Sequence, residues 1–239
     1  DWPNVRTIIN AAAYTDVDGA ETPEGEKLAW AVNDEAVENL VSVASSNDIL
    51  LIHIGTDYEF DGTKKEPYTE DDEVKPLGNY AKSKAAGSQK AMQAPKHFLI
   101  RTAWVVGDGK NFVRTMIGLG QKGIEPKVVA DQVGRPTFTS ELAKAIKFLL
   151  ENNPAYGIYN VTNSGEPVSW AEFTRAIFEE AGFNLKVTDT TTKDYFASKP
   201  GTAPRPSNSV LDLTKIESIG FKPRDWRENL KEYLSKELS

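Results

Sequence analysis

Three nearly continuous apolar runs, separated by stretches with helical periodicity, most strongly constrain the fold of this chain. The runs are Arg6–Ala11, Ile49–Ile54 and Phe98–Thr102, and such runs are typical of parallel strands that are covered on both faces. Between the first two, Ala29–Ala44 places apolar residues at helical spacing, and Tyr80–Met92 is predicted as the next helix. This alternation predicts an α/β fold with a Rossmann-like doubly wound parallel sheet.

Short segments that follow the predicted strands form the expected ligand site. They are Ala11–Thr15, Gly55–Tyr58 and Ala103–Val105. Open α/β sheets bind their ligands at the carboxyl ends of the strands. We therefore expect these three segments to lie around one site.

The sequence pattern changes after about Ala130, where shorter elements are predicted. Ser140 is expected to cap a helix over Glu141–Leu150, and Ser169 a helix over Trp170–Ala181. The other predicted elements are a turn at Gly134–Thr137, a strand at Gly157–Val161, a loop over Thr188–Ser209 and a terminal helix over Trp226–Leu238. We expect a nucleotide-binding Rossmann domain over residues 1–130. Residues 131–239 are expected to form mainly a smaller α/β substrate-binding domain, with some segments returning to the Rossmann domain.

The charge and cysteine content exclude several functional classes. The net charge is -7 and charges of both signs are spread along the chain, which argues against nucleic acid as a partner. The sequence contains no cysteine and no apolar run of 18 residues, so a cytoplasmic protein without a membrane partner is predicted. It also shows no spacing typical of a metal site, and no metal is predicted.

Two tyrosines are followed by a lysine four residues later, Tyr80 by Lys84 and Tyr195 by Lys199. The first pair opens a helical run and shares one helix face. The second lies among turn residues, and a helix is disfavoured there because Lys199 precedes Pro200. We predict that the first pair is functional, although an ordinary amphipathic pair is an equal alternative on spacing alone.

Thr56, Tyr80 and Lys84 together can protonate a carbonyl while a nicotinamide delivers hydride. An unperturbed tyrosine has a pKa of about 10, and a nearby lysine ammonium lowers that value. The same ammonium can hold the ribose hydroxyls of a cofactor. Thr56 can donate a hydrogen bond to the substrate oxygen where negative charge develops.

Histidines and tryptophans outside this set are interpreted as structural. His53 and His97 lie within or beside apolar strands, which favours packed or hydrogen-bonded roles over metal ligation. Trp170 and Trp226 are interpreted as packing residues.

A family resemblance is carried by strings that are spread over nearly the whole chain. They are Asn10–Asp18, Gly55–Gly62, Pro67–Glu70, Pro76–Tyr80, Arg101–Trp104, Asp131–Thr137, Gly157–Asn160, Ser169–Trp170 and Arg205–Ser209. Together they closely resemble the dTDP-4-dehydrorhamnose reductases, a family of extended short-chain dehydrogenase/reductases. The resemblance implies reduction of the C4 carbonyl of dTDP-4-dehydro-L-rhamnose to dTDP-L-rhamnose, with NADPH or NADH as cofactor.

The resemblance also implies roles for individual residues. The catalytic residues are Thr56, Tyr80 and Lys84. The residues on the cofactor side are Ala11, Ala12, Ala13, Thr15, Tyr80 and Lys84. The residues on the side of the sugar nucleotide are Asp57, Tyr58, Trp104 and Arg205. Arg205 is expected to bind the diphosphate, because a guanidinium pairs well with phosphate oxygens.

The chain departs from the family pattern in two places. Gly55 stands where the family usually has serine, which is expected to remove a hydroxyl near the substrate. The glycine-rich loop that holds the cofactor pyrophosphate in relatives is missing before the first apolar run. If these are all its residues, the chain is expected to be inactive, to bind no NADPH and to self-associate through its open sheet edge, for instance as a homodimer.

Two alternative functions remain open. One is a regulatory or binding subunit similar to the β subunit of methionine adenosyltransferase, and the presence of Thr56, Tyr80 and Lys84 favours an enzyme over it. The other is a sugar-nucleotide epimerase or dehydratase of the same superfamily, against which the strings at Gly55–Tyr58 and Arg101–Trp104 argue.

Overall fold

The centre of the molecule is a four-stranded parallel sheet. The computed structural model describes residue 2 and residues 4–238. The strands follow the order β1-β2-β3-β8, and each neighbouring pair is parallel. Their bounds are β1 (Thr7–Asn10), β2 (Leu50–Ile54), β3 (His97–Arg101) and β8 (Gly157–Asn160). The predicted α/β class, the parallel sheet and its strands are confirmed.

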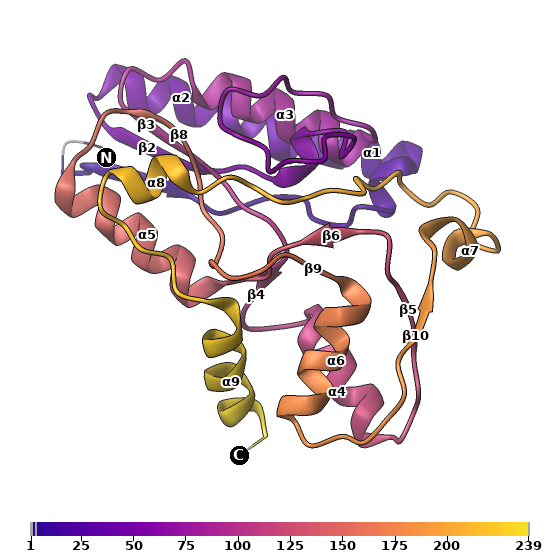
Figure 1. The fold of residues 1–239 in the computed structure, drawn as a ribbon. Helices are drawn as coiled ribbons and strands as arrows, with labels where there is room; N and C mark the ends of the chain where they lie inside the picture. Colours follow the sequence, from indigo (N-terminus) through magenta and orange to yellow (C-terminus); the bar gives the residue numbers. More distant parts are fainter. Residues whose placement is uncertain (1, 3, 239) are drawn as a thin grey trace.

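One face of this sheet is covered by a long helical segment and by a second helix beside it (Figure 1). The segment consists of α1 (Pro23–Trp30), the π-helical η2 (Ala31–Glu35) and α2 (Ala36–Ser46), and its neighbour is α3 (Asn79–Ala91). The buried residues of this face are Val37, Ala44, Ile49, Leu51, Ala91 and Ala94. The predicted crossover from the first strand to the second is therefore present.

The long helical segment begins at Pro23 and not at the predicted Ala29. Thr22 caps it, since its Oγ1 accepts a hydrogen bond from the backbone N–H of Gly25 at 3.1 Å. An N–H group at the first helical position has no acceptor within the helix, so proline, which has no N–H, is well suited to that position. The Thr-Pro pair is thus a helix-start signal that apolar periodicity alone overlooks.

The other face of the sheet is covered by α5 (Thr139–Asn152) and α8 (Thr214–Ser218). Its buried core includes Ile52, Phe98, Ile100, Ala145, Leu149 and Ile216. The predicted cap at Ser140 is wrong, because the helix begins at Thr139, two residues before the predicted start, and Phe138 is its N-cap without a side-chain bond. Helix α5 follows directly from strand β7 (Thr137–Phe138), so the backbone of that strand determines where the helix starts.

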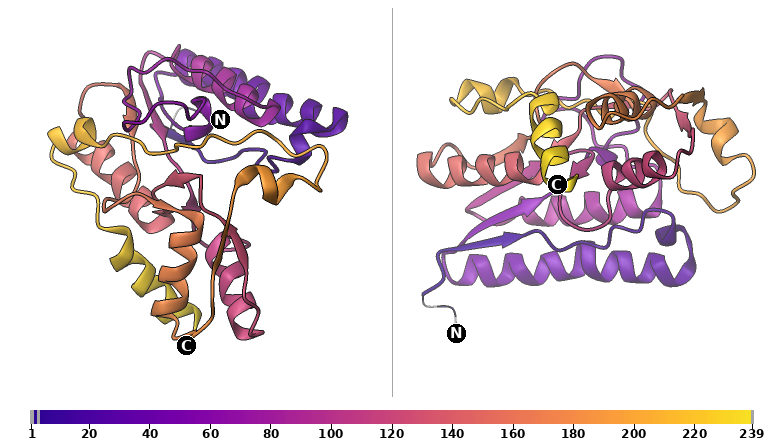
Figure 2. Two further views of the ribbon diagram at one scale, coloured as in Figure 1. Left: turned by 45° about the vertical axis from the view of Figure 1, so that its right-hand side comes forward. Right: turned by 90° about the horizontal axis from the view of Figure 1, so that it is seen from below.

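A second part of the molecule lies below the sheet in Figure 1 and is built from three helices and short strand pairs (Figures 1 and 2). The helices are α4 (Phe112–Gln121), α6 (Trp170–Glu180) and α9 (Trp226–Glu237). The strand pairs join β4 (Val105–Val106) to β7, β6 (Val133–Gly134) to β9 (Val168–Ser169), and β5 (Lys127–Val129) to β10 (Thr188–Thr190).

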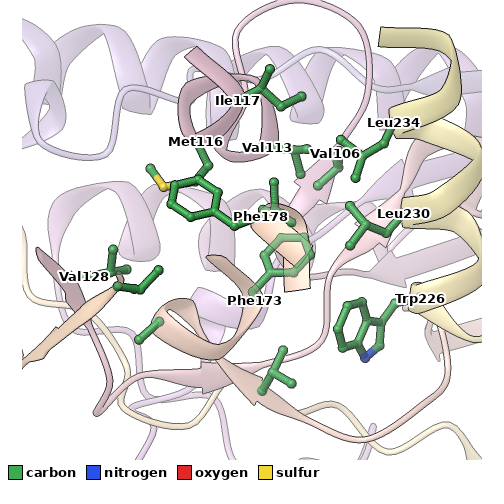
Figure 3. Close-up of a cluster of buried hydrophobic side chains, with 14 of the residues drawn as sticks. Val106, Val113, Met116, Ile117, Val128, Phe173, Phe178, Trp226, Leu230 and Leu234 are labelled. Carbon is green, nitrogen blue, oxygen red and sulfur yellow. The ribbon is translucent and has the colours of Figure 1, made fainter. Parts of the chain in front are cut away.

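The core of this second part is apolar and rich in aromatic rings (Figure 3). Its fully buried members include Val113, Phe173, Ile177 and Trp226, each 0 % exposed. Helix α6 starts with a capping box between Ser169 and Glu172, and this confirms the predicted cap. The predicted packing role of Trp226 and the terminal helix are also confirmed.

Two further segments differ from what the sequence predicted. Helix α4, capped by Asn111, was not predicted. The stretch expected to be a loop contains strand β10 and helix α7 (Thr192–Phe196). Strand β10 exists because it pairs with the distant β5, and pairing over such a separation leaves no local signal. Within the part of the chain that is described, no helix is both long and apolar enough to span a membrane.

Candidate active site

A cavity of about 500 Å³ lies at the carboxyl ends of the strands, where the ligand site was predicted. The predicted site residues that line it are Ala11, Ala13, Thr15, Thr56, Asp57, Tyr58, Tyr80, Lys84 and Trp104. Ala12 does not line it, and its backbone N–H donates to Asn10 Oδ1 at 3.2 Å. Arg205 lines a second cavity of about 370 Å³, which shares Tyr58 and Trp170 with the first.

The backbone after β2 continues beside β3 and so presents Thr56 to the cavity. The N–H groups of Gly55 and Asp57 donate to backbone carbonyls of residues 100 and 102 at 2.7 and 2.9 Å. Thr56 then caps the short η3 helix (Asp57–Glu59), where its Oγ1 accepts from the N–H of Tyr58 at 3.3 Å. The same hydroxyl donates to Asp57 Oδ1 at 3.2 Å. The position of Thr56 is therefore determined by the sheet.

Lys84 is buried and bonded to the same strand. Its Nζ donates to the carbonyl oxygen of Ile54 at 2.6 Å, and the residue is 3 % exposed. Burial lowers the pKa of Lys84 to about 8, although the negative charge of Glu59 acts in the opposite direction. Lys84 is therefore mostly charged at neutral pH and loses its proton in mild alkali.

Tyr80 lies one helical turn before Lys84 on α3. Burial raises the pKa of Tyr80 to about 12, and a hydrogen bond with Thr56 opposes this rise. The phenol is therefore protonated at neutral pH, as a proton donor must be. The expected lowering of the pKa of Tyr80 is not met in this structure, because burial outweighs the hydrogen bond with Thr56.

Helix α3 is held against η2 by a contact that only glycine permits. A Cβ atom added at Gly87 would lie 1.8 Å from the backbone oxygen of Asn33. The side chain of Asn33 donates to Ser83 Oγ at 3.1 Å, and Ser83 Oγ donates to the carbonyl oxygen of Tyr80 at 2.9 Å. Asn33 also accepts from the backbone N–H of Tyr14, at 2.8 Å, in the segment that follows β1. These contacts tie the first turn of α3 to the strand ends.

Asp57 and Tyr58 continue the polar side of the cavity. Asp57 is 3 % exposed, and burial raises the pKa of its carboxyl group to about 6. The ring of Tyr58 meets that of Tyr80 edge to face, with a centroid distance of 5.5 Å. Burial also raises the pKa of Tyr58. Asp57 is thus the carboxyl group in the cavity that changes its charge within reach of neutral pH.

Two tryptophans form an aromatic wall across the cavity. Trp104 and Trp170 are stacked, with ring centroids 3.6 Å apart and an interplanar angle of 11°. Trp104 has a left-handed backbone with a φ of 49°, and a Cβ at Gly134 would lie 2.7 Å from its ring. Trp170 lines the cavity, so its interpretation as a packing residue alone was incomplete. Its position directly after the helix cap Ser169 was the signal that could have placed it at a helix end beside the site.

Arg205 is held by an acidic partner. Its Nη2 donates to both carboxylate oxygens of Asp18 at 2.9 Å, and its Nη1 donates to the carbonyl oxygen of Ala203 at 2.8 Å. Its guanidinium also lies 4.6 Å from the ring centroid of Phe196. Arg205, the residue predicted to bind the diphosphate, therefore lies beside the first cavity. Its positive charge is balanced by the carboxylate of Asp18.

The alternative tyrosine and the buried histidine do not line the first cavity, although Tyr195 lines the second cavity with Arg205. Tyr195 on α7 is 38 % exposed, and Lys199 Nζ lies 3.9 Å from its ring centroid. His53 is 1 % exposed, its Nδ1 accepts from Asn10 at 3.0 Å, and burial lowers its pKa to about 3. It is therefore a neutral structural residue. Among residue 2 and residues 4–238, no cluster of three or more histidines and carboxylates is arranged to hold a metal ion.

A parallel sheet with a threonine at a strand end and a Tyr–Lys pair one helical turn apart defines a nucleotide-dependent reductase of the short-chain dehydrogenase/reductase class. The family model described as "RmlD substrate binding domain" matches residues 3–239, and the chain belongs to this family.

Individual relatives agree with this assignment. The chain is 42 % identical to a dTDP-4-dehydrorhamnose reductase of Aggregatibacter actinomycetemcomitans, over 96 % of this chain and 80 % of that protein. A crystal structure of a dTDP-4-dehydrorhamnose reductase from Clostridium acetobutylicum superposes with a TM-score of 0.91 and 41 % identity, covering 98 % of this chain and 81 % of that one. The dTDP-4-dehydrorhamnose reductase of Bacillus anthracis, in complex with NADP, superposes with a TM-score of 0.89 and 35 % identity. The match covers 97 % of this chain and 80 % of that one. The family resemblance and the fold class are confirmed.

Proposed function

We propose that this protein reduces the C4 carbonyl of dTDP-4-dehydro-L-rhamnose to give dTDP-L-rhamnose, with NADPH or NADH as the reductant. The observation that carries the proposal is that Thr56, Tyr80 and Lys84 meet in one cavity at the strand ends. The reductases that the chain resembles support this substrate, and the relative bound to NADP supports the cofactor.

In this proposal, Tyr80 donates the proton of the reaction. A bound nicotinamide supplies the hydride that C4 receives. The phenol of Tyr80 gives its proton to the carbonyl oxygen, so the C=O group becomes a CH–OH group and a phenolate remains until solvent reprotonates it. The ammonium of Lys84 stabilises that phenolate, and Thr56 Oγ1 donates a hydrogen bond to the developing oxyanion.

The residues on the cofactor side fit such a group. Ala11 and Ala13 line the cavity with small side chains beside Thr15, which leaves space for a flat ring. Lys84 Nζ donates to the carbonyl oxygen of Ile54, and an ammonium carries three donors in all, which supports contacts with ribose hydroxyls.

The substrate side is assigned to residues of both cavities, which share Tyr58. We propose that Asp57, Tyr58 and Trp104 contact the sugar and that Arg205 binds the diphosphate. The position of Arg205 beside Tyr58 in the adjoining cavity supports this role. Residues 1–130 would then bind mainly the cofactor, and residues 131–239 mainly the sugar nucleotide.

Self-association and a cytoplasmic location are further parts of the proposal. Strand β1 forms an edge of the described sheet, and Ile9 on it is 49 % exposed, which supports pairing between copies. The lack of cysteine supports a reducing compartment. Light scattering at several protein concentrations checks the first of these predictions.

The deciding experiment is a coupled assay on the full-length protein, in which the substrate is made from dTDP-glucose by the upstream enzymes. We expect NADPH to be consumed and dTDP-L-rhamnose to be formed in equal amounts, as measured by absorbance and by mass spectrometry with NMR. Formation of a different sugar nucleotide, or of none while NADPH binds normally, would contradict the proposal.

A further inference from the structure

A buried carboxylate, that of Glu59, lies behind the turn that carries Thr56. Glu59 is 1 % exposed and does not line the cavity. Its Oε1 accepts from Ser88 Oγ at 2.6 Å, and its Oε2 accepts from Arg101 Nε at 2.8 Å. Arg101 is itself 2 % exposed and also donates to the carbonyl oxygen of Glu70 at 3.0 Å. Glu59 is therefore a fully bonded internal charge.

Two observations place this carboxylate beside the catalytic residues. A Cβ atom added at Gly55 would lie 3.0 Å from Glu59 Oε1, and Gly55 separates Thr56 from Ile54, whose carbonyl holds Lys84. Ser88 follows Lys84 by four residues on α3, so both side chains leave the same helix face. The carboxylate thus lies beside Gly55 and is bonded to the side chain of Ser88, on the two segments that position the site.

The absent side chain of Gly55 belongs to the same arrangement. Glycine in place of the family's usual serine was expected to remove a hydroxyl near the substrate. The Cβ direction at Gly55 instead points at Glu59 Oε1 and Ser88 Oγ, at 3.0 and 3.4 Å. Glycine at this position leaves room for the buried carboxylate, and a serine there would crowd it.

We propose that Glu59 is a positioning residue for the reduction: its bonds to Ser88 and Arg101 hold the Thr56 turn against α3, and its buried carboxylate supports Lys84 on the same face of that helix. The catalytic part of this statement rests on the proposed function, whereas the effect on Lys84 does not.

The charges around Lys84 explain why this one carboxylate matters. Of the ionisable groups that face it, His53 is neutral with a pKa lowered to about 3 by burial, and Tyr80 is neutral with a pKa of about 12. Asp57, with a pKa raised to about 6 by burial, is ionised at pH 8, and Arg101 is a cation bonded to Glu59. Glu59 is the group whose charge supports the ammonium of Lys84 against burial.

The direct test is an NMR titration of Lys84 in protein with carbon-labelled lysine. In Glu59→Gln, we expect the pKa of Lys84 to fall by about one unit, which at pH 8 lowers its charged fraction from about one half to about one tenth. Ser88→Ala is the matched control, since it removes one hydrogen bond to Glu59 and keeps the charge. It should leave that pKa within about 0.3 units, and Glu59→Asp should retain most of the wild-type value.

An unchanged pKa of Lys84 in a folded Glu59→Gln variant overturns the proposal. If that variant does not fold, because Arg101 is left buried without its partner, Glu59→Gln combined with Arg101→Met removes both charges. The pKa of Lys84 should fall there too, by less than in Glu59→Gln, because the positive charge of Arg101 is removed together with the negative charge of Glu59. No fall in the double variant also overturns the proposal.

Turnover separates this inference from the proposed function. In Glu59→Gln, the alkaline limb of the kcat profile should move to lower pH by the same amount as the pKa of Lys84. If Lys84→Met turns over normally, the proposed function fails. The NMR titration of Glu59→Gln still tests the effect of Glu59 on Lys84 independently.

Discussion

The two sides of the cavity are built in different ways. On the sheet side, Thr56 and Lys84 are held by backbone groups of β2 and its continuation, with Lys84 Nζ 2.6 Å from the carbonyl oxygen of Ile54. On the opposite side, the wall of Trp104 and Trp170 comes from a left-handed residue after β3 and from the first residue of a helix. Arg205 lies there in an irregular segment and is held by the side chain of Asp18.

This difference separates the two tasks of the site, which are proton transfer on the sheet side and ligand binding on the opposite side. Strand backbones and a closely packed helix leave little freedom, and proton transfer requires groups that are placed within hydrogen-bond reach. Stacked rings and an ion pair between side chains can be changed without disturbing the sheet. We therefore expect substitutions on the sheet side to affect turnover and folding, and those on the opposite side to affect binding.

The largest expected effect tests the sheet side directly. Replacing Tyr80 by phenylalanine should lower kcat by roughly two to four orders of magnitude, because a positioned proton donor is lost, while KM changes little. Tyr195→Phe is the matched control and should turn over normally. Steady-state kinetics of both variants decide the matter, and the reverse result would place the chemistry on α7.

The next effect concerns the rigidity of helix α3. Gly87→Ala should destabilise the protein by about 3 kcal/mol, because the new methyl group meets the backbone of Asn33. Gly118→Ala on α4 has open space around it and should stabilise the protein by about 0.5–1 kcal/mol. Urea unfolding measures both changes. Equal stability of the two variants would show that α3 is not closely packed and would remove the contrast between the two sides.

A smaller effect is expected on the opposite side. Arg205→Ala should weaken the binding of dTDP by about tenfold to a hundredfold, since hydrogen bonds to charged groups contribute about 1.5–3 kcal/mol. Thymidine lacks the diphosphate and should bind almost unchanged. Asp18→Asn should strengthen dTDP binding a few-fold, because it frees the guanidinium. Calorimetry with both ligands tests this, and equal losses for dTDP and thymidine would give Arg205 a structural role.

The smallest effect sharpens the comparison through pH. The pKa of Asp57 is raised from 3.8 to about 6 in the folded protein. Its favourable contribution to the free energy of unfolding is therefore complete below pH 3.8 and is lost as the pH rises through 6. Asp57→Asn should therefore stabilise the protein by about 1–2 kcal/mol at pH 7.5 and by progressively less towards pH 4. Thermal unfolding across this range checks the sign. A gain that is independent of pH would assign the effect to packing.

Local sequence patterns determined most of the framework. The apolar runs at Arg6–Ala11 and Ile49–Ile54 predicted parallel strands because a sheet covered on both faces requires apolar residues on both faces. Ser169 predicted the start of α6, because its capping box with Glu172 is a contact between near neighbours. The residue types Thr56, Tyr80 and Lys84 predicted carbonyl reduction because their spacing joins one strand end to one helix face.

Contacts between residues far apart in the sequence were decided by the tertiary structure alone. Trp170 becomes part of the cavity only because it stacks on Trp104, 66 positions earlier. Strand β10 forms only because β5 offers it a partner. The pKa of Tyr80 is raised, where the sequence predicted a lower value, because burial outweighs the hydrogen bond with Thr56. Glu59 looked like one more charge in a polar string, and its place behind Gly55 follows from the packing of β2, β3 and α3, since burial and distance are properties of the folded chain.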